Sequence, residues 1–477
     1  MNTSTAQTPF VDALRMDVTS TENGMATYKS SLDACVDLFF TLWAMRGQDV
    51  QRLCNMVQKA WKEDIGTALR LLFRARDIRE GAWERQIFKD AVSFLVAHDS
   101  TESLKKNIAL IPEYGRWDDL EVFFGTPYEN DALEVIKQWL ETNNWLCAKW
   151  MRRQGKNFHL VRKYLDLGSS AYRKMLVERT STVETLMALG KREEIEFWKL
   201  PSLASARYQK AFYKNAKERY EEYKAWLQSW TEKINAWAVY PYDVIKSLHY
   251  GDSIVAEAQR ANLPNYLEWS SRRILPMCDV SWSMNQPVWN NKNLDVLDVC
   301  LSLGLYISER NIGPFHNAFM TFSAEPEIQY LTWKTLSKRM SQLSTADRDM
   351  NTNFEKAMKK IVNTAKTAQI QPEDMPTDIL ILSDMEFDQA SRGQHITAQT
   401  MIEDLFHEAW YTVPNIIYWN LASRNKNIPV KFDTHWTALI SGFSPSILKA
   451  LLRGDEMTPQ WIMSQTINSE RYEPIVV

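Results

Sequence analysis

The chain has 477 residues, enough for two or three domains with large cores, and its 45% hydrophobic and 24% charged residues are typical of a soluble globular protein. The net charge of −3 excludes a generally basic surface, so any nucleic-acid site has to be local. No stretch approaches the roughly 18 apolar residues that a membrane span requires. The five cysteines are scattered and form no Cys-x-x-Cys pair, which indicates reduced thiols, no zinc knuckle and a cytoplasmic setting.

The first part of the chain has a helical pattern. Residues 1–27 are polar and rich in threonine, without the apolar segment of a signal peptide, and we expect a flexible leader there. Residues 28–270 carry little strand signal, and we predict a stacked array of antiparallel, HEAT-like helices with one long helix from about Ala204 to Gln228. Apolar residues recur there at helical spacing in runs that begin near 32–40, 48–62, 63–76, 82–98 and 102–110.

Within this helical region, residues 145–181 are strongly basic. They hold nine basic residues against two acidic ones, in a chain whose total charge is negative, with aromatic side chains interleaved. Cations that neutralise phosphates and flat rings that stack on bases are what irregular RNA requires of a surface. An ordinary solvated helix face, with its aromatic rings turned into the core, explains the pattern equally well. The candidate RNA-binding residues are Lys149, Arg152, Arg153, Lys156, Arg162, Lys163, Arg173 and Lys174.

From Ile274 the pattern changes to alternating strands and helices, which predicts a doubly wound, Rossmann-like sheet over 271–455, followed by a tail at 456–477. The glycine fingerprints of dinucleotide and P-loop sites are absent, so we expect no nucleotide cofactor. Strands are expected near 274–279, 316–322, 327–332, 378–384, 415–421 and 436–441. Helices are expected near 293–310, 335–343, 353–367, 397–411 and 445–453.

The first of these strands ends in an Asp-x-Ser-x-Ser pattern made by Asp279, Ser281 and Ser283. Ligands of open α/β sheets bind at the carboxyl ends of the strands. One carboxylate and two hydroxyls are hard oxygen ligands, which suit Mg²⁺ or Mn²⁺. A capped turn of ordinary kind is the alternative. Further along, Thr352 precedes a helical run and Asp384 closes a second apolar strand.

In this order the five residues resemble the metal-ion-dependent adhesion site of von Willebrand factor A domains. In that family the serines and the threonine bind the cation, the aspartates bind it directly or through water, and one position stays open for a partner's carboxylate. The resemblance implies a metal site made of Asp279, Ser281, Ser283, Thr352 and Asp384. The family often has Gly before the threonine, where this chain has Asn351.

The whole chain resembles the Ro autoantigen (TROVE) family and a related group of phage and bacterial proteins. The resemblance rests on strings such as 21–28, 76–81, 111–120, 233–236 and 383–388, and it extends over about 21–455. Ro proteins form a ring of helical repeats closed by an A domain and bind small structured or misfolded RNAs. The resemblance therefore implies an α + α/β fold and a non-enzymatic ribonucleoprotein component with no membrane contact.

Its metal site would bind an acidic residue of a protein partner. A protein-only scaffold that uses the metal site without RNA is one alternative. A metal-dependent hydrolase is another, with Glu386 or Asp388 as its base. His407 and Glu408 lack the second histidine of a His-Glu-x-x-His zinc site, so His407 is expected on a helix surface.

Overall fold

The computed structural model divides the chain into two compact units. The sheet unit comprises Met1–Asp49 and Asn265–Thr466, and the helical unit comprises Val50–Pro264 and Ile467–Val477. Within the described residues, no helix combines the length and the apolar character that crossing a bilayer takes. The structure describes residues 17–45, 47, 49–98, 102–180, 182–200, 202–229, 239–249, 253–268, 270–288, 294–322, 326–345, 353–391, 396–422, 425, 427–451 and 457–477.

The ends of the chain correct three predicted boundaries. Part of the expected leader, from residue 17, is ordered as the antiparallel pair β1 (Val18–Ser20) and β2 (Ala26–Tyr28). Helix α2 (Ala34–Thr41) belongs to the sheet unit, where Ser441 Oγ donates to the Phe39 carbonyl at 3.0 Å. The expected C-terminal tail is shared between the two units. The β1–β2 pairing is local, whereas the contacts of α2 and of the C-terminal residues join positions hundreds of residues apart, which local composition cannot reveal.

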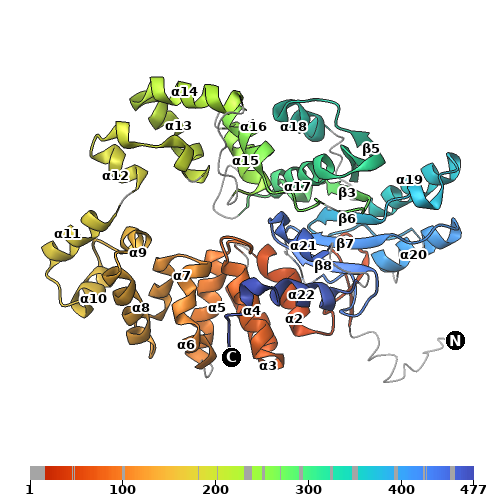
Figure 1. Cartoon of the computed structure of the whole chain (residues 1–477). Helices are drawn as coiled ribbons and strands as arrows, with labels where there is room; N and C mark the ends of the chain where they lie inside the picture. Colours follow the sequence, from red (N-terminus) through yellow and green to blue (C-terminus); the bar gives the residue numbers. More distant parts are fainter. Residues whose placement is uncertain are drawn as a thin grey trace. The chain divides into compact units, whose positions relative to one another are not determined.

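The helical unit confirms the all-α prediction for this region (Figure 1). From α3 to α11, successive helices lie beside one another in chain order, and each turns its apolar stripe toward its neighbours. The helices are α3 (Val50–Glu63), α4 (Ile65–Arg76), α5 (Arg85–His98), α6 (Glu102–Lys106), α7 (Ile111–Tyr114), α8 (Glu129–Glu141), α9 (Trp145–Trp150), α10 (Lys156–Tyr164), α11 (Ser169–Arg179), α12 (Val183–Ala188), α13 (Ser202–Asn215), α14 (Lys217–Gln228), α15 (Pro241–His249) and α16 (Ser253–Asn262).

The predicted long helix over 204–228 is wrong, because the chain breaks it at Ala216. This residue leaves the helical region with φ −146° and ψ 44°, and α13 and α14 continue on either side. The break brings Phe212 and Tyr220 against the same ring of Phe197, at centroid distances of 5.1 and 5.5 Å. Packing around one aromatic core therefore prevails over the uninterrupted helical pattern of the sequence.

The sheet unit holds a six-stranded sheet whose strands match the predicted ones within two residues at each end. Their spatial order is β5-β4-β3-β6-β7-β8, parallel except for the antiparallel edge strand β5. The order reverses between β3 and β6, as in doubly wound sheets. The strands are β3 (Ile274–Asp279), β4 (Ala318–Phe322), β5 (Glu327–Tyr330), β6 (Asp378–Ser383), β7 (Asn415–Asn420) and β8 (Thr437–Ser441).

The two central strands are buried along their whole length, which is characteristic of a parallel sheet with both faces covered. The covering helix α17 approaches β3 closely because it carries Gly304. A Cβ built on that glycine would lie 2.3 Å from Cys278 Sγ. The helices of this unit beyond α2 are α17 (Val296–Arg310), α18 (Leu336–Thr345), α19 (Phe354–Thr367), α20 (Ala398–Glu408), α21 (Leu448–Leu451) and α22 (Pro459–Ile467).

Candidate metal centre and basic surface

Two buried carboxylates lie where the strand order reverses. Asp279 is the last residue of β3, and Asp384 directly follows the last residue of β6. The two strands are parallel neighbours, so both side chains come to the same edge of the sheet. Asp279 is 0% exposed and Asp384 is 3% exposed. The structure thus brings together two of the five residues that the sequence assigned to a metal site.

Hydroxyl and amide groups surround Asp279. Its Oδ1 accepts from the Ser281 amide at 3.0 Å, and its Oδ2 accepts from Ser383 Oγ at 2.7 Å. The hydroxyls of Ser281 and Ser283 lie 3.0 Å apart. Ser383 was not among the predicted site residues, although its position directly before Asp384 at a strand end could have indicated it. Thr352, the remaining predicted ligand, lies outside the described residues.

The charge of Asp279 is poorly compensated. Burial, followed by repulsion from Asp384, raises the pKa of Asp279, although hydrogen bonds from Ser281 and Ser383 oppose the rise. Within the described part of the chain, no Lys or Arg pairs with Asp279. A buried carboxylate pair with adjacent hydroxyls therefore fits a hard divalent cation, whose charge would remove the repulsion.

Glu386 links the N-terminal segment to the loop after β6, a structural role that the sequence did not indicate. It is 3% exposed, and its carboxylate accepts from the Glu22 amide at 2.7 Å and from Asn425 and Asn427 at 3.0 and 2.7 Å. These bonds hold the residues before β2 against the loop that follows β6. Because its oxygens already accept three hydrogen bonds, Glu386 is a poor candidate for the general base of a hydrolase.

The candidate RNA-binding side chains of residues 145–181 lie on several helices and the loops between them. Phe158 and Tyr172 are buried, as the alternative of a solvated helix face requires. Lys174 pairs with Glu178 at 3.9 Å, and Arg173 Nε donates to the Arg153 carbonyl at 3.1 Å. Most of the eight candidate RNA-binding side chains are exposed. Besides Arg173 and Lys174, the candidates are Lys149, Arg152, Arg153, Lys156, Arg162 and Lys163.

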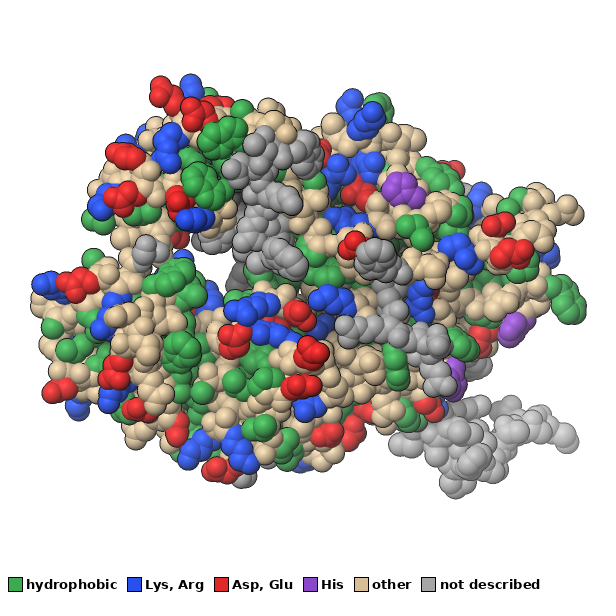
Figure 2. Space-filling model, viewed as in Figure 1, with side chains coloured by type: hydrophobic (Ala, Val, Ile, Leu, Met, Phe, Trp, Pro, Cys, Tyr) green, Lys and Arg blue, Asp and Glu red, His purple; other side chains and the backbone are tan. Residues whose placement is uncertain are grey.

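Arg152 joins a denser group of charges that the sequence did not single out. It pairs with Glu121 at 2.9 Å and with Asp118 at 3.8 Å, and Arg116 also pairs with Asp118 at 2.9 Å. The Arg116 guanidinium lies 3.4 Å from the ring centroid of Trp150. We call this group the arginine cluster, and Figure 2 shows Lys and Arg gathered beside Asp and Glu on the helical unit. It consists of Arg76, Arg85, Lys89, Arg116 and Arg152 around Asp118, Asp119 and Glu121.

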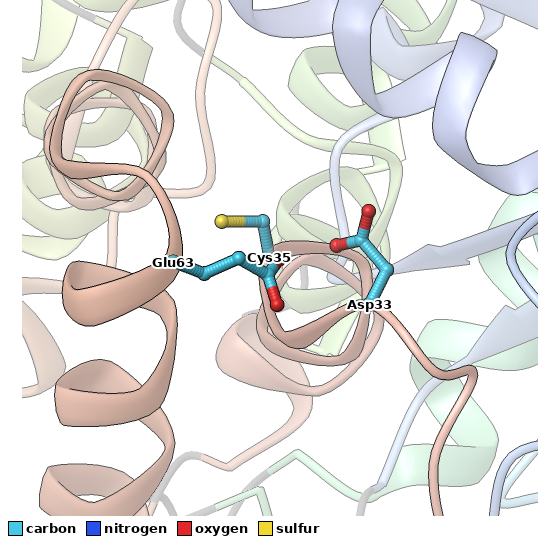
Figure 3. Close-up of side chains that lie close together, drawn as sticks. All are labelled: Asp33, Cys35 and Glu63. Carbon is cyan, nitrogen blue, oxygen red and sulfur yellow. The ribbon is translucent and has the colours of Figure 1, made fainter.

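Figure 3 labels Asp33 and Cys35 at the start of α2 and Glu63 at the end of α3. Asp33 caps α2 by accepting from the Val36 amide at 2.8 Å, and Cys35 is buried. Asp33 and Cys35 belong to the sheet unit and Glu63 to the helical unit, so we assign no cation to them.

The fold and site define an α + α/β protein with an acidic centre at the reversal point of its sheet. Residues 21–123 and 132–273, just over half of the chain, match the family described as "Domain of unknown function (DUF2828)", and the chain belongs to that family. Residues 273–473 match "Domain of unknown function (DUF7788)". The chain is also similar to uncharacterized protein L728 of Acanthamoeba polyphaga mimivirus, at 25% identity over 96% of this chain and 88% of the viral protein.

Proposed function

We propose that this protein is a non-catalytic binding scaffold whose sheet unit is a von Willebrand factor A-like domain with a Mg²⁺-dependent docking site. Asp279, Ser281, Ser283 and Asp384 would hold the cation, with Thr352 as the fifth ligand carried over from the family resemblance. The observation that carries the proposal is the buried Asp279–Asp384 pair at the reversal point of the sheet.

The surroundings of the pair support binding more than hydrolysis. A cation held there would keep one coordination position open, and the carboxylate of an acidic side chain from a partner could fill it. The chain itself keeps Asp279 in place through Ser281 and Ser383, and both carboxylates are buried. Of the two candidate bases, Glu386 is already engaged by the Glu22 amide and two asparagines.

Metal binding is tested by titrating the chelator-treated protein with Mg²⁺ and Mn²⁺ and following its melting temperature. A ligand at 100 times its Kd stabilises the folded state by about 2.7 kcal/mol. We expect both cations to raise the melting temperature of the wild type and to have no effect on Asp279→Asn or Asp384→Asn. The control is Asp374→Asn, an exposed aspartate of the same unit, which should respond like the wild type. An equal rise in all four proteins would exclude the site.

RNA binding by the helical unit, with its helices stacked as a HEAT-like array, is the second function that we propose. The observation that favours it is the arginine cluster, where five cations stand against three carboxylates and Arg116 stacks on Trp150. Guanidinium groups beside an aromatic ring suit the phosphates and bases of irregular RNA. With this function the protein would be a Ro-like ribonucleoprotein component. Without it, the metal site would serve a protein-only scaffold.

The two possibilities differ in their response to salt. We expect a small RNA to copurify with the protein and its affinity to fall steeply as salt rises, because neutralised phosphates release counterions. Charge reversal of Arg152, Arg153 and Lys156 should abolish that binding. Reversal of Lys210 and Lys214 on α13, which are exposed in the same unit, should leave most of it. An RNA-free protein whose partner binding ignores salt would favour the protein-only scaffold.

A further inference from the structure

A groove of about 1130 Å³ opens at the edge of the sheet where β6, β7 and β8 begin. Thr377, Pro414 and Trp436, which directly precede these three strands, all line it. Asp279 and Asp384 lie at the opposite, carboxyl ends of the strands, so the groove is separate from the candidate metal centre. Its volume slightly exceeds the roughly 300–1,000 Å³ of sites for small molecules.

Two tryptophans give the groove an unusual rim. Trp410 is 93% exposed and Trp436 is 54% exposed, and the two large rings lie on the same groove instead of being scattered singly over the surface. Both have a left-handed backbone, with φ +63° and +58°, which is costly for a bulky residue. Figure 2 shows hydrophobic and His side chains at the surface near α20.

The backbone around these tryptophans is held by hydrogen bonds. The Trp410 amide donates to the His407 carbonyl at 3.0 Å, and the Ile416 amide donates to the Trp436 carbonyl at 2.9 Å. The backbone at Trp410 is therefore fixed by the end of α20, and the backbone at Trp436 by the start of the β7–β8 pair. Rings presented on a fixed backbone lose little freedom when they bind a ligand.

Most polar side chains of the groove are already engaged within the protein. Gln399 donates to Glu403 at 2.8 Å, Arg273 Nε donates to the Met375 carbonyl at 2.8 Å, and the Tyr411 hydroxyl donates to the Ile370 carbonyl at 2.9 Å. The groove therefore offers a ligand mainly the faces of its aromatic rings. It also offers the N–H groups of the Trp410 and Trp436 indoles and of the imidazoles of His407 and His435, which line it as well.

This composition discriminates between ligand classes. Arg273 is the one Lys or Arg among the lining residues, and the charge of Glu403 balances it, so the groove carries no excess of positive charge for a phosphate chain. The described residues of the groove contain no cluster of three metal-ligating side chains. The engaged amide and carboxylate groups leave few partners for the hydroxyls of a sugar.

A proline-rich segment matches what remains. In the polyproline II conformation its rings stack on aromatic side chains, and its carbonyls, which have no internal partner, accept hydrogen bonds from indole and imidazole groups. It needs no charge for binding, in agreement with the balanced charge of the groove. We propose that the groove bounded by Trp410 and Trp436 binds a proline-rich segment of a partner protein.

The test is fluorescence anisotropy on the full chain with a labelled decaproline peptide and a labelled Gly-Ser peptide of equal length. We expect decaproline to bind and the Gly-Ser peptide not to bind. Trp410→Ala and Trp436→Ala should each weaken decaproline binding at least tenfold. Trp282→Ala, which removes a 72% exposed tryptophan at the other end of the sheet, should leave it unchanged.

Trp410→Gly separates binding from folding, because glycine adopts the positive φ without strain. It should melt at or above the wild-type temperature and still lose decaproline binding. Equal binding of the two peptides, or full binding by Trp410→Ala and Trp436→Ala, would overturn the proposal. Binding of labelled oligouridylate that both variants lose, without binding of decaproline, would also overturn it and assign the groove to single-stranded nucleic acid. Peptide binding to this groove requires neither Mg²⁺ nor the arginine cluster. Absence of decaproline binding would therefore leave the proposed metal-dependent docking and RNA binding untouched.

Discussion

At the residue scale, two buried aspartates of this protein are compensated in opposite ways. Burial alone would raise the pKa of Asp119, but the charge of Arg76 and hydrogen bonds from Arg85 and the Arg116 amide hold it below its usual range. Among the described residues, Asp279 has hydroxyl and amide donors and a second carboxylate as neighbours but no Lys or Arg partner, and its pKa is raised. A satisfied ion pair supports the fold, whereas uncompensated charge marks a position where a cation can bind.

Asp119 should make the helical unit sensitive to acid. Because its folded-state pKa is lowered, its stabilisation is fully present above the unfolded value of about 4 and is lost as pH falls through the folded value. Asp119→Asn leaves Arg76, whose side chain is 3% exposed, without its charged partner, and should cost about 3–5 kcal/mol at pH 7. The thermal melts of variant and wild type should differ widely at pH 7 and converge toward pH 3.

The matched control is Asp131→Asn, because Asp131 is 39% exposed and lies 4.0 Å from Lys105. An exposed pair at that distance contributes about 0–1 kcal/mol. A loss of stability in Asp119→Asn that stayed constant from pH 7 to pH 3 would contradict the charge-based explanation.

At the scale of elements, the position of α17 on β3 depends on a glycine inside a helix. A central glycine normally destabilises a helix by about 1 kcal/mol relative to alanine. Here the added methyl would overlap Cys278 Sγ, and Cys278 is fully buried next to Asp279. The packing of a helix on the strand that carries the candidate metal ligand therefore prevails over helix propensity.

Gly304→Ala should destabilise the sheet unit by about 1–3 kcal/mol, since overpacking costs more than the gain in propensity. Adding Cys278→Ala removes the overlapping atom and should recover much of that loss, so the two substitutions should be coupled by at least about 1 kcal/mol. Chemical denaturation of the single and double variants measures this coupling.

Gly168→Ala serves as the comparison, because nothing lies within 4 Å of the added atom and φ is −65°. Because Gly168 is also the N-cap of α11, where alanine is less favourable than glycine, Gly168→Ala should cost no more than about 1 kcal/mol. Additive effects of Gly304→Ala and Cys278→Ala would show that the helix moves aside without cost.

At the scale of the whole molecule, neither unit is a continuous piece of chain. Residues 17–49 complete the sheet unit, where Phe39 and Phe40 are fully buried and Trp43 lies against Gly442. Residues from Ile467 complete the helical unit, where the Tyr472 hydroxyl donates to Asp77 at 3.0 Å. Cutting the chain near 270 should therefore damage both parts.

A fragment of residues 265–466 should aggregate or melt without cooperativity, because the surface that α2 covers becomes exposed. Joining residues 17–49 to it through a flexible linker should restore a monomer with a cooperative melt. Size exclusion and calorimetry decide the outcome, and a well-folded, monomeric 265–466 fragment would refute the division.

The sequence by itself determined the class of the fold and the edge of the sheet where Asp279 and Asp384 meet. Hydrophobic periodicity and strand-ending polar residues are local signals, and parallel strands bring their carboxyl ends together. Only the tertiary structure decided that Ser383 supports Asp279, that Glu386 anchors the N-terminal segment, and that α13 and α14 are separate.

The arginine cluster and the tryptophan groove also depend on tertiary structure. Arg85, Arg116 and Arg152 are far apart in the sequence, and so are Trp410 and Trp436. Tryptophans at helical spacing suggest core residues, yet exposure depends on what the rest of the chain covers. Contacts between distant segments are fixed by the summed packing of the fold, and no local pattern encodes them.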